Sequence, residues 1–407
     1  MTMQSRAAAR LTGSAPEQPF AGLCRFVLAR ILQGASHGTL LIVEPSGRRA
    51  VYHGSEPGAD AQITFKRWRT LRRFLTAGHL GFGEAYVAGD FETPDVCALL
   101  TWALQNEQSL SRVWQGSLAS RLASILMHLA NRNTIAGSRR NIAAHYDLGN
   151  DFYTAWLDKG MQYSSAIYSA PDQSLEAAQE AKLDRIVELL APEKADRVLE
   201  IGCGWGALAE RLAVACGCHV TGLTLSTEQL GYAHERLARV TLAPELRLED
   251  YRSLQGVFDR IASVEMIEAV GEAYWPTYFA TLRRCLKAGG RAVIQAITIN
   301  ERYFPSYRAH PDFIQKYIFP GGMLPTPSAI RENCGASGLK LGTIETFGQS
   351  YAMTLAEWRR RFTAAFPGLR SLGFDDEFFR KWDYYLAYCE IGFRLGILDV
   401  GFYVMEG

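Results

Sequence analysis

The sequence has 407 residues, which is enough for two domains with a sizeable core. Its formal net charge is +1 at pH 7, so no global field favours nucleic acid, and no apolar run approaches the ~18 residues that span a bilayer. Residues 1–20 lack the apolar core of a signal peptide and are predicted to be a mobile leader. The eight scattered cysteines include no C-x-x-C pair, which predicts reduced thiols in a cytoplasmic protein and no metal site.

Residues 21–110 are predicted to form a small α+β domain that associates with lipid membranes. Short alternating runs separated by turn residues give way to longer apolar segments typical of helices. In chain order we expect a helix at 20–32, strands at 39–43, 50–53 and 62–65, and helices at 68–76 and 96–106. Residues 111–140 are helical in pattern but end in polar residues and glycine, and are predicted to be a helical linker.

Cationic side chains surround Trp68 in this first domain. Such residues beside a large aromatic ring suit an anionic membrane surface, to which the protein would attach peripherally. The alternative is an ordinary solvated helix face. The cations of this basic patch are Lys66, Arg67, Arg69, Arg72 and Arg73.

The most informative stretch is Val198–Gly206, an apolar run that ends in glycines at 202, 204 and 206. A helical pattern follows, so the stretch predicts a strand, a tight turn and a helix. Glycine allows a sharp bend and a close approach of the backbone to a ligand. The G-x-G-x-G spacing, with Glu200 before it, resembles the loop that holds S-adenosylmethionine (SAM) in class I methyltransferases; a turn without a ligand is the alternative.

Residues 141–407 are predicted to be an α/β domain of the class I SAM-methyltransferase type, with a Rossmann-like, mostly parallel, doubly wound sheet. Its ligand would lie at the carboxyl ends of the strands. Strands are expected at 198–201, 219–224, 261–264, 291–299 and 339–346. Segment 382–405 is predicted to be an aromatic helix, and the aromatic insertion 300–327 to be a satellite core or the lining of a channel for an apolar substrate.

Seven motifs, in this order and at this spacing, resemble those of the cyclopropane-fatty-acyl-phospholipid synthases and the related mycolic acid cyclopropane synthases. The resemblance covers the catalytic half almost continuously, and the first domain fits the family's bacterial two-domain form. The motifs are His145-Tyr-Asp-Leu-Gly-Asn-Asp, Gln162-Tyr-Ser, Ile201-Gly-Cys-Gly-Trp-Gly, Leu223-Thr-Leu-Ser, Ile267-Glu-Ala-Val-Gly, Lys316-Tyr-Ile-Phe-Pro-Gly-Gly and Phe393-Arg.

The resemblance implies transfer of the SAM methyl group to the cis double bond of an unsaturated phospholipid acyl chain. A carbocation forms, and a base then removes a proton so that a cyclopropane ring closes. Aromatic faces stabilise a cation in a dry site, although filling the core is the other role open to most of these rings. The candidate channel rings are Tyr168, Tyr303, Tyr307, Phe313 and Tyr317.

The same resemblance assigns a SAM pocket. Because the second strand ends in Thr224 rather than in an acid, ribose recognition is assigned to Gln229. Glu249 and Asp250 are placed at the adenine end, with a capped loop as the alternative. The full set is Tyr163, Ser164, Glu200, Gly202, Gly204, Trp205, Gly206, Thr224, Leu225, Gln229, Leu248, Glu249 and Asp250.

In the family a bound bicarbonate serves as the base, held by a Cys, a Glu, a His, a main-chain site at an Ile, and a Tyr. The resemblance maps these positions onto Ser165, Glu268, Gln295, Ile297 and Tyr351. Serine here replaces cysteine and glutamine replaces histidine, which keeps hydrogen bonding but removes a titratable imidazole. The substitutions weaken the case for bicarbonate.

Glu390 is predicted to act as the base instead. An acid in so apolar a helix would have a raised pKa, and a hydrogen bond from Gln295 or Tyr351 would hold it. The alternative is an ion pair with Arg394, one turn away. Cys389 is expected to line the pocket. A displaced base would also allow a methyl- or methylene-branched product, which the sequence does not separate from cyclopropane.

Two other classes of function compete with this prediction. One is a small-molecule SAM methyltransferase, which would need neither the aromatic insertion nor the first domain. The other is a lipid-binding module with an inactive loop, against which the intact Glu268 and Tyr351 argue. Unsaturated membrane phospholipid is therefore the expected partner, and nucleic acid is not. A homodimer would gain avidity, although the sequence shows no interface.

Overall fold

The computed structural model describes residues 20–114, 137 and 148–407. The chain divides into two compact units, Met1–Ser117 and Leu118–Gly407. Most of the predicted linker lies outside the described residues, and its first residues belong to a helix, α4 (Glu107–Trp114). Among the described helices, none is long and apolar enough to cross a membrane.

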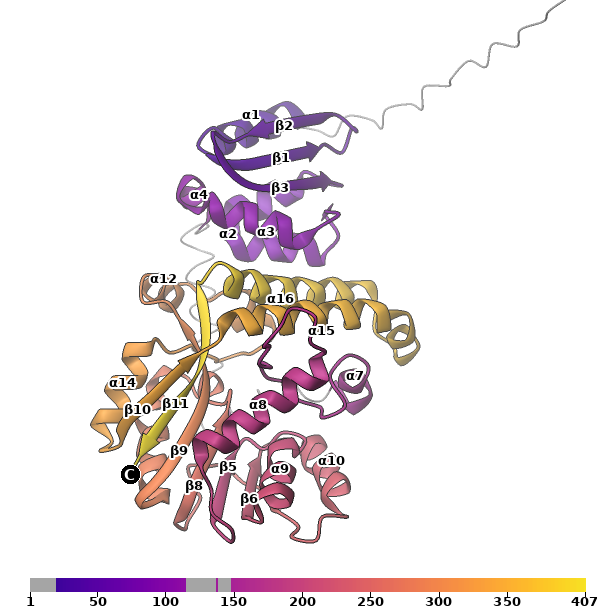
Figure 1. Ribbon diagram of the computed structural model, residues 1–407. Coiled ribbons are helices and arrows are strands. Elements are labelled where there is room, and N and C mark those ends of the chain that lie inside the picture. The colour runs from indigo at the N-terminus through magenta and orange to yellow at the C-terminus, as the bar shows by residue number, and fades with distance from the viewer. Residues whose placement is uncertain (1–19, 115–136, 138–147) are drawn as a thin grey trace, which may run out of the picture. The chain divides into compact units, whose positions relative to one another are not determined.

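The first unit has a four-stranded sheet in the order β2-β1-β3-β4 (Figure 1). Strand β1 pairs antiparallel with β2 and parallel with β3. The predicted strands and helices are all present. Their bounds are α1 (Ala21–Leu32), β1 (His37–Val43), β2 (Arg49–His53), β3 (Glu56–Phe65), α2 (Arg69–Val87), β4 (Phe91–Glu92) and α3 (Val96–Gln105).

Helix α2 continues well beyond its predicted end at residue 76. Gly78 breaks the helical geometry with φ 59° and ψ −141°, and a second helical segment follows it to Val87. The glycine therefore marks a kink, as its permissive backbone allows, and the prediction that the helix ends there is wrong.

The second unit is built on a seven-stranded sheet in the order β10-β11-β9-β8-β5-β6-β7. Neighbouring strands from β9 through β8, β5 and β6 to β7 run parallel, while β11 lies antiparallel to both β9 and β10. This confirms the predicted mostly parallel, doubly wound sheet. The bounds are β5 (Arg197–Ile201), β6 (His219–Thr224), β7 (Glu245–Leu248), β8 (Phe258–Val264), β9 (Leu286–Ile299), β10 (Lys340–Thr346) and β11 (Leu398–Glu406).

Both faces of this sheet are covered by helices, which explains why its strands are apolar on both sides. One core cluster joins Leu282 of α11 to Ile261 of β8, and another joins Leu212 of α9 to Val198 of β5. The helices are α7 (Asn150–Thr154), α8 (Leu175–Leu190), α9 (Ala207–Cys216), α10 (Thr227–Leu237), α11 (Trp275–Cys285), α12 (Phe304–Ala309), α13 (Phe313–Tyr317), α14 (Pro327–Ala336), α15 (Gly348–Leu369) and α16 (Asp376–Arg394).

The C-terminal segment differs from its prediction as a single helix over 382–405. Helix α16 ends at Arg394, Gly396 adopts a left-handed φ of 67°, and the chain then enters β11. A left-handed glycine is a common helix terminator. The aromatic residues after it, Phe402 and Tyr403, are buried because β11 is an inner strand of the sheet, paired with β10 on one side and β9 on the other.

Candidate active site

The predicted strand, glycine turn and helix are formed by β5, residues 202–206 and α9. Gly202, Gly204 and Gly206 all have positive φ, at 84°, 51° and 86°. The backbone N–H groups of Gly202 and Cys203 both donate to the carbonyl of Leu223, 3.0 and 2.8 Å away, and so fix the turn to β6. A Cβ added at Gly204 would meet no atom within 4 Å. The loop is therefore open to a ligand at that residue.

Several predicted SAM-pocket residues follow the carboxyl ends of β6 and β7, at the same edge of the sheet as the loop. Thr224 donates its hydroxyl hydrogen to the Gln229 amide oxygen at 2.9 Å, and both side chains are buried. Leu225 comes next and is partly buried, while Leu248, at the end of β7, is 43 % exposed. The indole N–H of Trp205 donates to Asn150 at 2.8 Å, which ties the loop to α7.

The acids of this pocket behave differently from one another. Glu200 is buried, one of its carboxyl oxygens has no hydrogen-bond partner, and burial raises its pKa to about 8. Asp250 accepts two hydrogen bonds from the Arg252 guanidinium, at 2.8 and 2.6 Å, and one from the Arg252 backbone. The capped-loop alternative therefore describes Asp250, while Glu249 beside it lies 3.5 Å from Arg247.

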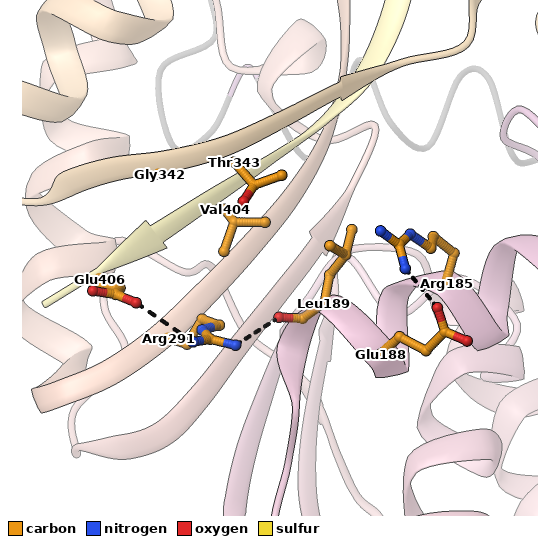
Figure 2. Close-up of a pocket in the computed structure, with 8 residues that line it drawn as sticks. All are labelled: Arg185, Glu188, Leu189, Arg291, Gly342, Thr343, Val404 and Glu406. Carbon is orange, nitrogen blue, oxygen red and sulfur yellow. Dashed lines mark hydrogen bonds and ion pairs between the residues drawn. The ribbon is translucent and has the colours of Figure 1, made fainter.

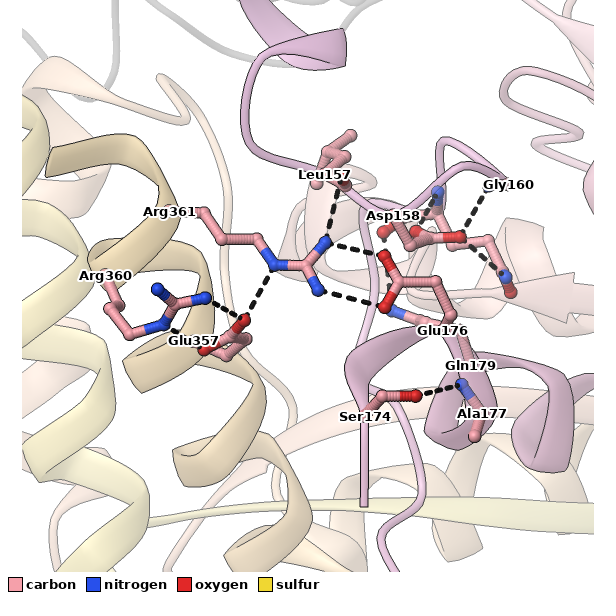
Figure 3. A network of polar contacts seen from close by, with 11 residues as sticks. Leu157, Asp158, Gly160, Ser174, Glu176, Ala177, Gln179, Glu357, Arg360 and Arg361 are labelled. Carbon is pink, nitrogen blue, oxygen red and sulfur yellow. Dashed lines mark hydrogen bonds and ion pairs between the residues drawn. The ribbon is translucent and has the colours of Figure 1, made fainter. Parts of the chain in front are cut away.

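A polar network that includes Glu176 and Gln179 of α8 and Arg361 of α15 lies near the segment that carries Ser164; Figure 3 shows these three side chains. Arg361 of α15 makes a bidentate ion pair with Glu176 of α8, at 2.7 and 2.9 Å. Gln179, one turn further along α8, donates to the carbonyl of Ser164 at 2.9 Å. Helix α8, which is joined to α15 by this ion pair, thus holds the backbone at Ser164.

Three of the five predicted bicarbonate-site residues converge on a carboxylate that was not predicted. Glu265 follows β8 directly, and its Oε1 accepts from the backbone N–H of Ser165 at 2.8 Å and from Gln295 Nε2 at 2.7 Å. Its Oε2 accepts from the Tyr351 hydroxyl at 2.7 Å. The backbone of Glu265 has φ +47°, which is rare for a residue with a side chain. We call Glu265 with these three donors the carboxylate cradle.

The remaining two predicted residues form a second site next to the cradle. Glu268 Oε1 accepts from the backbone N–H of Ile297 at 2.5 Å, and its Oε2 is buried without a partner. Burial, together with the nearby Glu265 charge, raises the pKa of Glu268 to about 8. Burial also raises the pKa of Glu265, but hydrogen bonds from Ser165 and Tyr351 and the charge of Lys182 oppose it. At neutral pH, Glu268 is therefore the protonated member of the pair.

Tyrosines of the insertion and of α16 lie near these acids. The Tyr163 and Tyr385 hydroxyls are 2.8 Å apart. Burial raises the pKa of Tyr307 well above its ordinary value, and Asp312, Cys389 and Glu268 raise it further. Tyr307 and Cys389 are thus close enough to influence each other, and their roles as pocket-lining residues stay predictions.

The other four predicted channel rings have different surroundings. Phe313 is 1 % exposed and packs against Tyr317 and Tyr384, so it belongs to a satellite core. The Arg302 guanidinium lies over the Tyr303 ring, with its Cζ 5.5 Å from the ring centroid. Burial raises the pKa of Tyr168 to about 12, and its charged neighbours are those of the Arg361 network rather than the acid pair.

Glu390 is buried on α16 and pairs with Arg394 at 2.7 Å. The hydrogen bonds predicted to hold it, from Gln295 or Tyr351, are made to Glu265 instead. This corrects the predicted geometry, and the alternative of an ion pair one helical turn away is what the structure contains.

The basic patch of the first unit also differs from its prediction. Trp68 is buried and stacks on Phe65, with ring centroids 5.5 Å apart, so it is not presented to a membrane. Asp90 is fully buried and forms ion pairs with three of the arginines. Lys66 pairs with Glu92 at 2.7 Å. The arginine distances to Asp90 are 3.5 Å for Arg67, 2.5 Å for Arg69 and 3.6 Å for Arg73.

Figure 2 shows a pocket away from this site, lined by residues of α8, β9, β10 and β11. Its polar groups are engaged with one another: Arg291 pairs with Glu406, and Arg185 with Glu188. The pocket lies near the start of β9, whereas Gln295 and Ile297 lie nearer its carboxyl end. Ligands of parallel sheets bind at the carboxyl ends, so this pocket is separate from the candidate active site.

The sequence profile of the family described as mycolic acid cyclopropane synthetase matches residues 134–402. The chain belongs to this family. It is accordingly a SAM-dependent methyltransferase of the fatty-acid-modifying type. The first residues of the matching His145 motif lie outside the described residues.

Relatives resemble both units. The tuberculostearic acid methyltransferase UfaA1 of Mycobacterium tuberculosis is 38 % identical over 400 residues, covering 95 % of this chain and 92 % of that protein. A cyclopropane-fatty-acyl-phospholipid synthase of Escherichia coli K12 is 36 % identical over 347 residues, which cover 83 % of this chain and 85 % of that protein. The solved structure of mycolic acid cyclopropane synthase CmaA1 with SAH and CTAB has a TM-score of 0.62 at 28 % identity, covering 66 % of this chain and 98 % of that one.

Proposed function

We propose that this protein transfers the methyl group of SAM to the cis double bond of an unsaturated phospholipid acyl chain. The observation that carries this proposal is the carboxylate cradle at the sheet edge, with tyrosines nearby and an open glycine loop on a neighbouring strand. An apolar alkene needs a dry site that stabilises positive charge and contains a base, and this site offers aromatic rings and two carboxyl groups.

The residues present fit SAM. Open space at Gly204 admits the ligand, and the positive φ of the three glycines turns the loop sharply around it. Exposed Leu248 offers an apolar face at the end of β7, and Gln229 with Thr224 lies at the end of β6. When bound, SAM supplies an electrophilic methyl group. A solved relative, CmaA1, was crystallised with SAH.

Two products are consistent with this methyl transfer. Loss of a proton from the new methyl group closes a cyclopropane ring, the product that the cyclopropane-fatty-acyl-phospholipid synthase relative is named for. A hydride shift before proton loss gives an exocyclic methylene branch. The similarity to a tuberculostearic acid methyltransferase over 95 % of the chain favours branching as the second candidate.

The test is incubation with methyl-labelled SAM and vesicles of unsaturated phospholipid, followed by mass and NMR analysis of the released fatty acids. We expect a mass gain of one CH₂ unit and either cyclopropane or vinylidene proton signals. Vesicles with fully saturated chains are the control. If the acyl chains of unsaturated vesicles gain no label, the proposed function is wrong.

A further inference from the structure

The carboxylate cradle is built from positions that the family resemblance assigns to a bicarbonate site. Ser165, Gln295 and Tyr351 are three of the five residues that the family resemblance assigns to that anion, and each gives its hydrogen bond to Glu265. Ile297, a fourth, donates its N–H to Glu268. With these donors already engaged by carboxylates of the chain, a separate bicarbonate does not fit.

We propose that Glu265 is the catalytic base, a carboxylate of the chain itself at the place that the family resemblance assigns to a bound bicarbonate. The inference rests on the proposed methyl transfer and names the group that completes it. After methyl transfer, the C–H bond of the cationic product breaks. Its electron pair closes the ring or forms the double bond, and the proton goes to the Glu265 carboxylate, which later releases it to solvent.

The backbone supports a functional role for Glu265. A residue with a side chain at φ +47° is strained, and such strain persists only where surrounding contacts hold it in place. The Glu265 N–H donates to the Gln295 carbonyl at 2.8 Å, while the Gln295 side chain holds the Glu265 carboxylate. One residue of β9 thus fixes both ends of Glu265 and aims its side chain into the cradle.

The charges around Glu265 suit a base that is ionised before the reaction. Lys182, buried on α8, donates to Ser164 at 2.9 Å and favours the charged form of Glu265. Glu268 is protonated at neutral pH, so the acid pair carries one negative charge rather than two. Both acids are only partly buried as residues, which leaves the carboxylate within reach of a substrate.

Glu390 is the rival base, and its surroundings argue against it. Its carboxylate is neutralised by Arg394, and its side chain is 4 % exposed. The two side chains that were expected to hold Glu390, Gln295 and Tyr351, donate to Glu265 instead. Glu265 is held by two neutral side chains and one backbone N–H, within the group of residues predicted to surround the base.

The test uses the full-length protein, with unsaturated phosphatidylglycerol vesicles and labelled SAM in buffer purged of carbon dioxide. Glu265→Gln keeps the shape of the side chain but removes the basic oxygen, so we expect turnover to fall by about 100-fold or more while SAM binding by calorimetry stays unchanged. Glu332→Gln, an exposed acid on α14, is the matched control and should turn over like the wild type. Wild-type turnover should not depend on added bicarbonate.

A second variant separates the chemical role of Glu265 from a structural one. Glu265→Gly relieves the positive φ and empties the cradle, leaving its three donors free. We expect this variant to be inactive in purged buffer and to recover turnover when bicarbonate is added. Full activity of Glu265→Gly without bicarbonate would overturn the proposal.

The remaining outcomes are equally decisive. Turnover of Glu265→Gln within about threefold of wild type, a bicarbonate requirement of the wild type, or loss of turnover in Glu390→Gln alone would each overturn the proposal of Glu265 while leaving methyl transfer intact. A wild type that labels no acyl chain would instead overturn the proposed function, and the assignment of the base with it.

Discussion

Glu265 and Glu268 are three positions apart, and their carboxyl groups influence each other's ionisation. Two acids in such proximity do not both ionise near neutral pH, because each charge disfavours the other. The hydrogen bonds divide their roles. Glu265 receives three donors on its two oxygens, which favours its charged form, whereas Glu268 receives one donor and has an unpartnered buried oxygen.

The raised pKa of Glu268 predicts how stability depends on pH. Since its folded pKa is about 8 against an ordinary value of 4.5, the stabilisation is complete below pH 4.5 and is lost as the pH rises toward 8. The slope from this group approaches about 1.4 kcal/mol per pH unit. Lys182, whose folded pKa is about 8, changes stability only above this window.

Replacing Glu268 by glutamine removes the titrating group but keeps an oxygen to accept from Ile297. We expect denaturant unfolding of Glu268→Gln to show a flatter dependence on pH between 5 and 8 than the wild type. The exposed Glu332→Gln variant should follow the wild-type curve. Parallel curves for Glu268→Gln and wild type would contradict the assigned protonation.

At the residue scale, the sequence identified the cradle's donors but not the acid that they hold. Ser165, Gln295 and Tyr351 stood out because they matched or departed from a family pattern at known positions. Glu265 belongs to none of the motifs used, and only three-dimensional proximity brings it to residues 100 positions earlier and 86 later. The sequence predicts Glu390 as the base, because an acid in an apolar helix is visible in the sequence. Whether Arg394 pairs with that acid depends on side-chain positions that the sequence does not contain.

At the scale of elements, two glycines of the loop, Gly204 and Gly206, have different surroundings. A Cβ at Gly206 would lie 3.2 Å from Ala233 Cβ and 3.3 Å from Leu237 Cδ1 of α10, whereas at Gly204 it would enter open space. Gly206 therefore serves packing between the loop and α10, and we propose that Gly204 leaves room for the ligand.

Alanine at each position tests this division. Both substitutions incur a left-handed backbone penalty of about 1 kcal/mol. Gly206→Ala should lower the melting temperature further because of its close contacts. Gly204→Ala should weaken SAM binding about tenfold with the smaller loss of stability. Calorimetric SAM titration and thermal unfolding measure the two effects, and unchanged SAM affinity in Gly204→Ala would refute the placement of the ligand.

Elements with clear periodicity were predicted from sequence, and those governed by tertiary context were not. Strands β5 and β6 lie within about a residue of their predictions, since apolar runs mark them. The kink at Gly78 and strand β11 were missed. In both, a glycine at positive φ changes the chain direction, and whether a helix resumes or a strand follows depends on which neighbours are available.

At the scale of the whole molecule, the catalytic unit should fold without the first one. The solved CmaA1 chain matches this chain over 98 % of its own length but over only 66 % of the present one. That relative therefore folds with a region equivalent to only part of this chain. We expect a fragment of residues 118–407 to unfold cooperatively and to bind SAM with unchanged affinity, as measured by calorimetry. Failure of this fragment to bind SAM would contradict the independence of the unit.

Membrane attachment is the role we propose for the first unit. Three arginines share one buried acid, Asp90, and so leave an excess of positive charge on the patch. We expect binding to anionic vesicles to weaken as salt rises, because screening shortens the reach of these charges. Flotation of the full chain with anionic and neutral vesicles measures this, and binding that ignores both salt and lipid charge would contradict it.

The position of β11 has a consequence for how the chain is synthesised. In the described sheet β11 is inserted between β9 and β10, and β10 pairs with no other strand. A ribosome delivers β9 and β10 first, so the nascent chain exposes the unpaired edge of β9 and a detached β10 until β11 emerges. Late, long-range strand insertion is slow and leaves open edges that aggregate. We therefore expect truncation before Leu398 to yield chains that depend on chaperones to remain in solution.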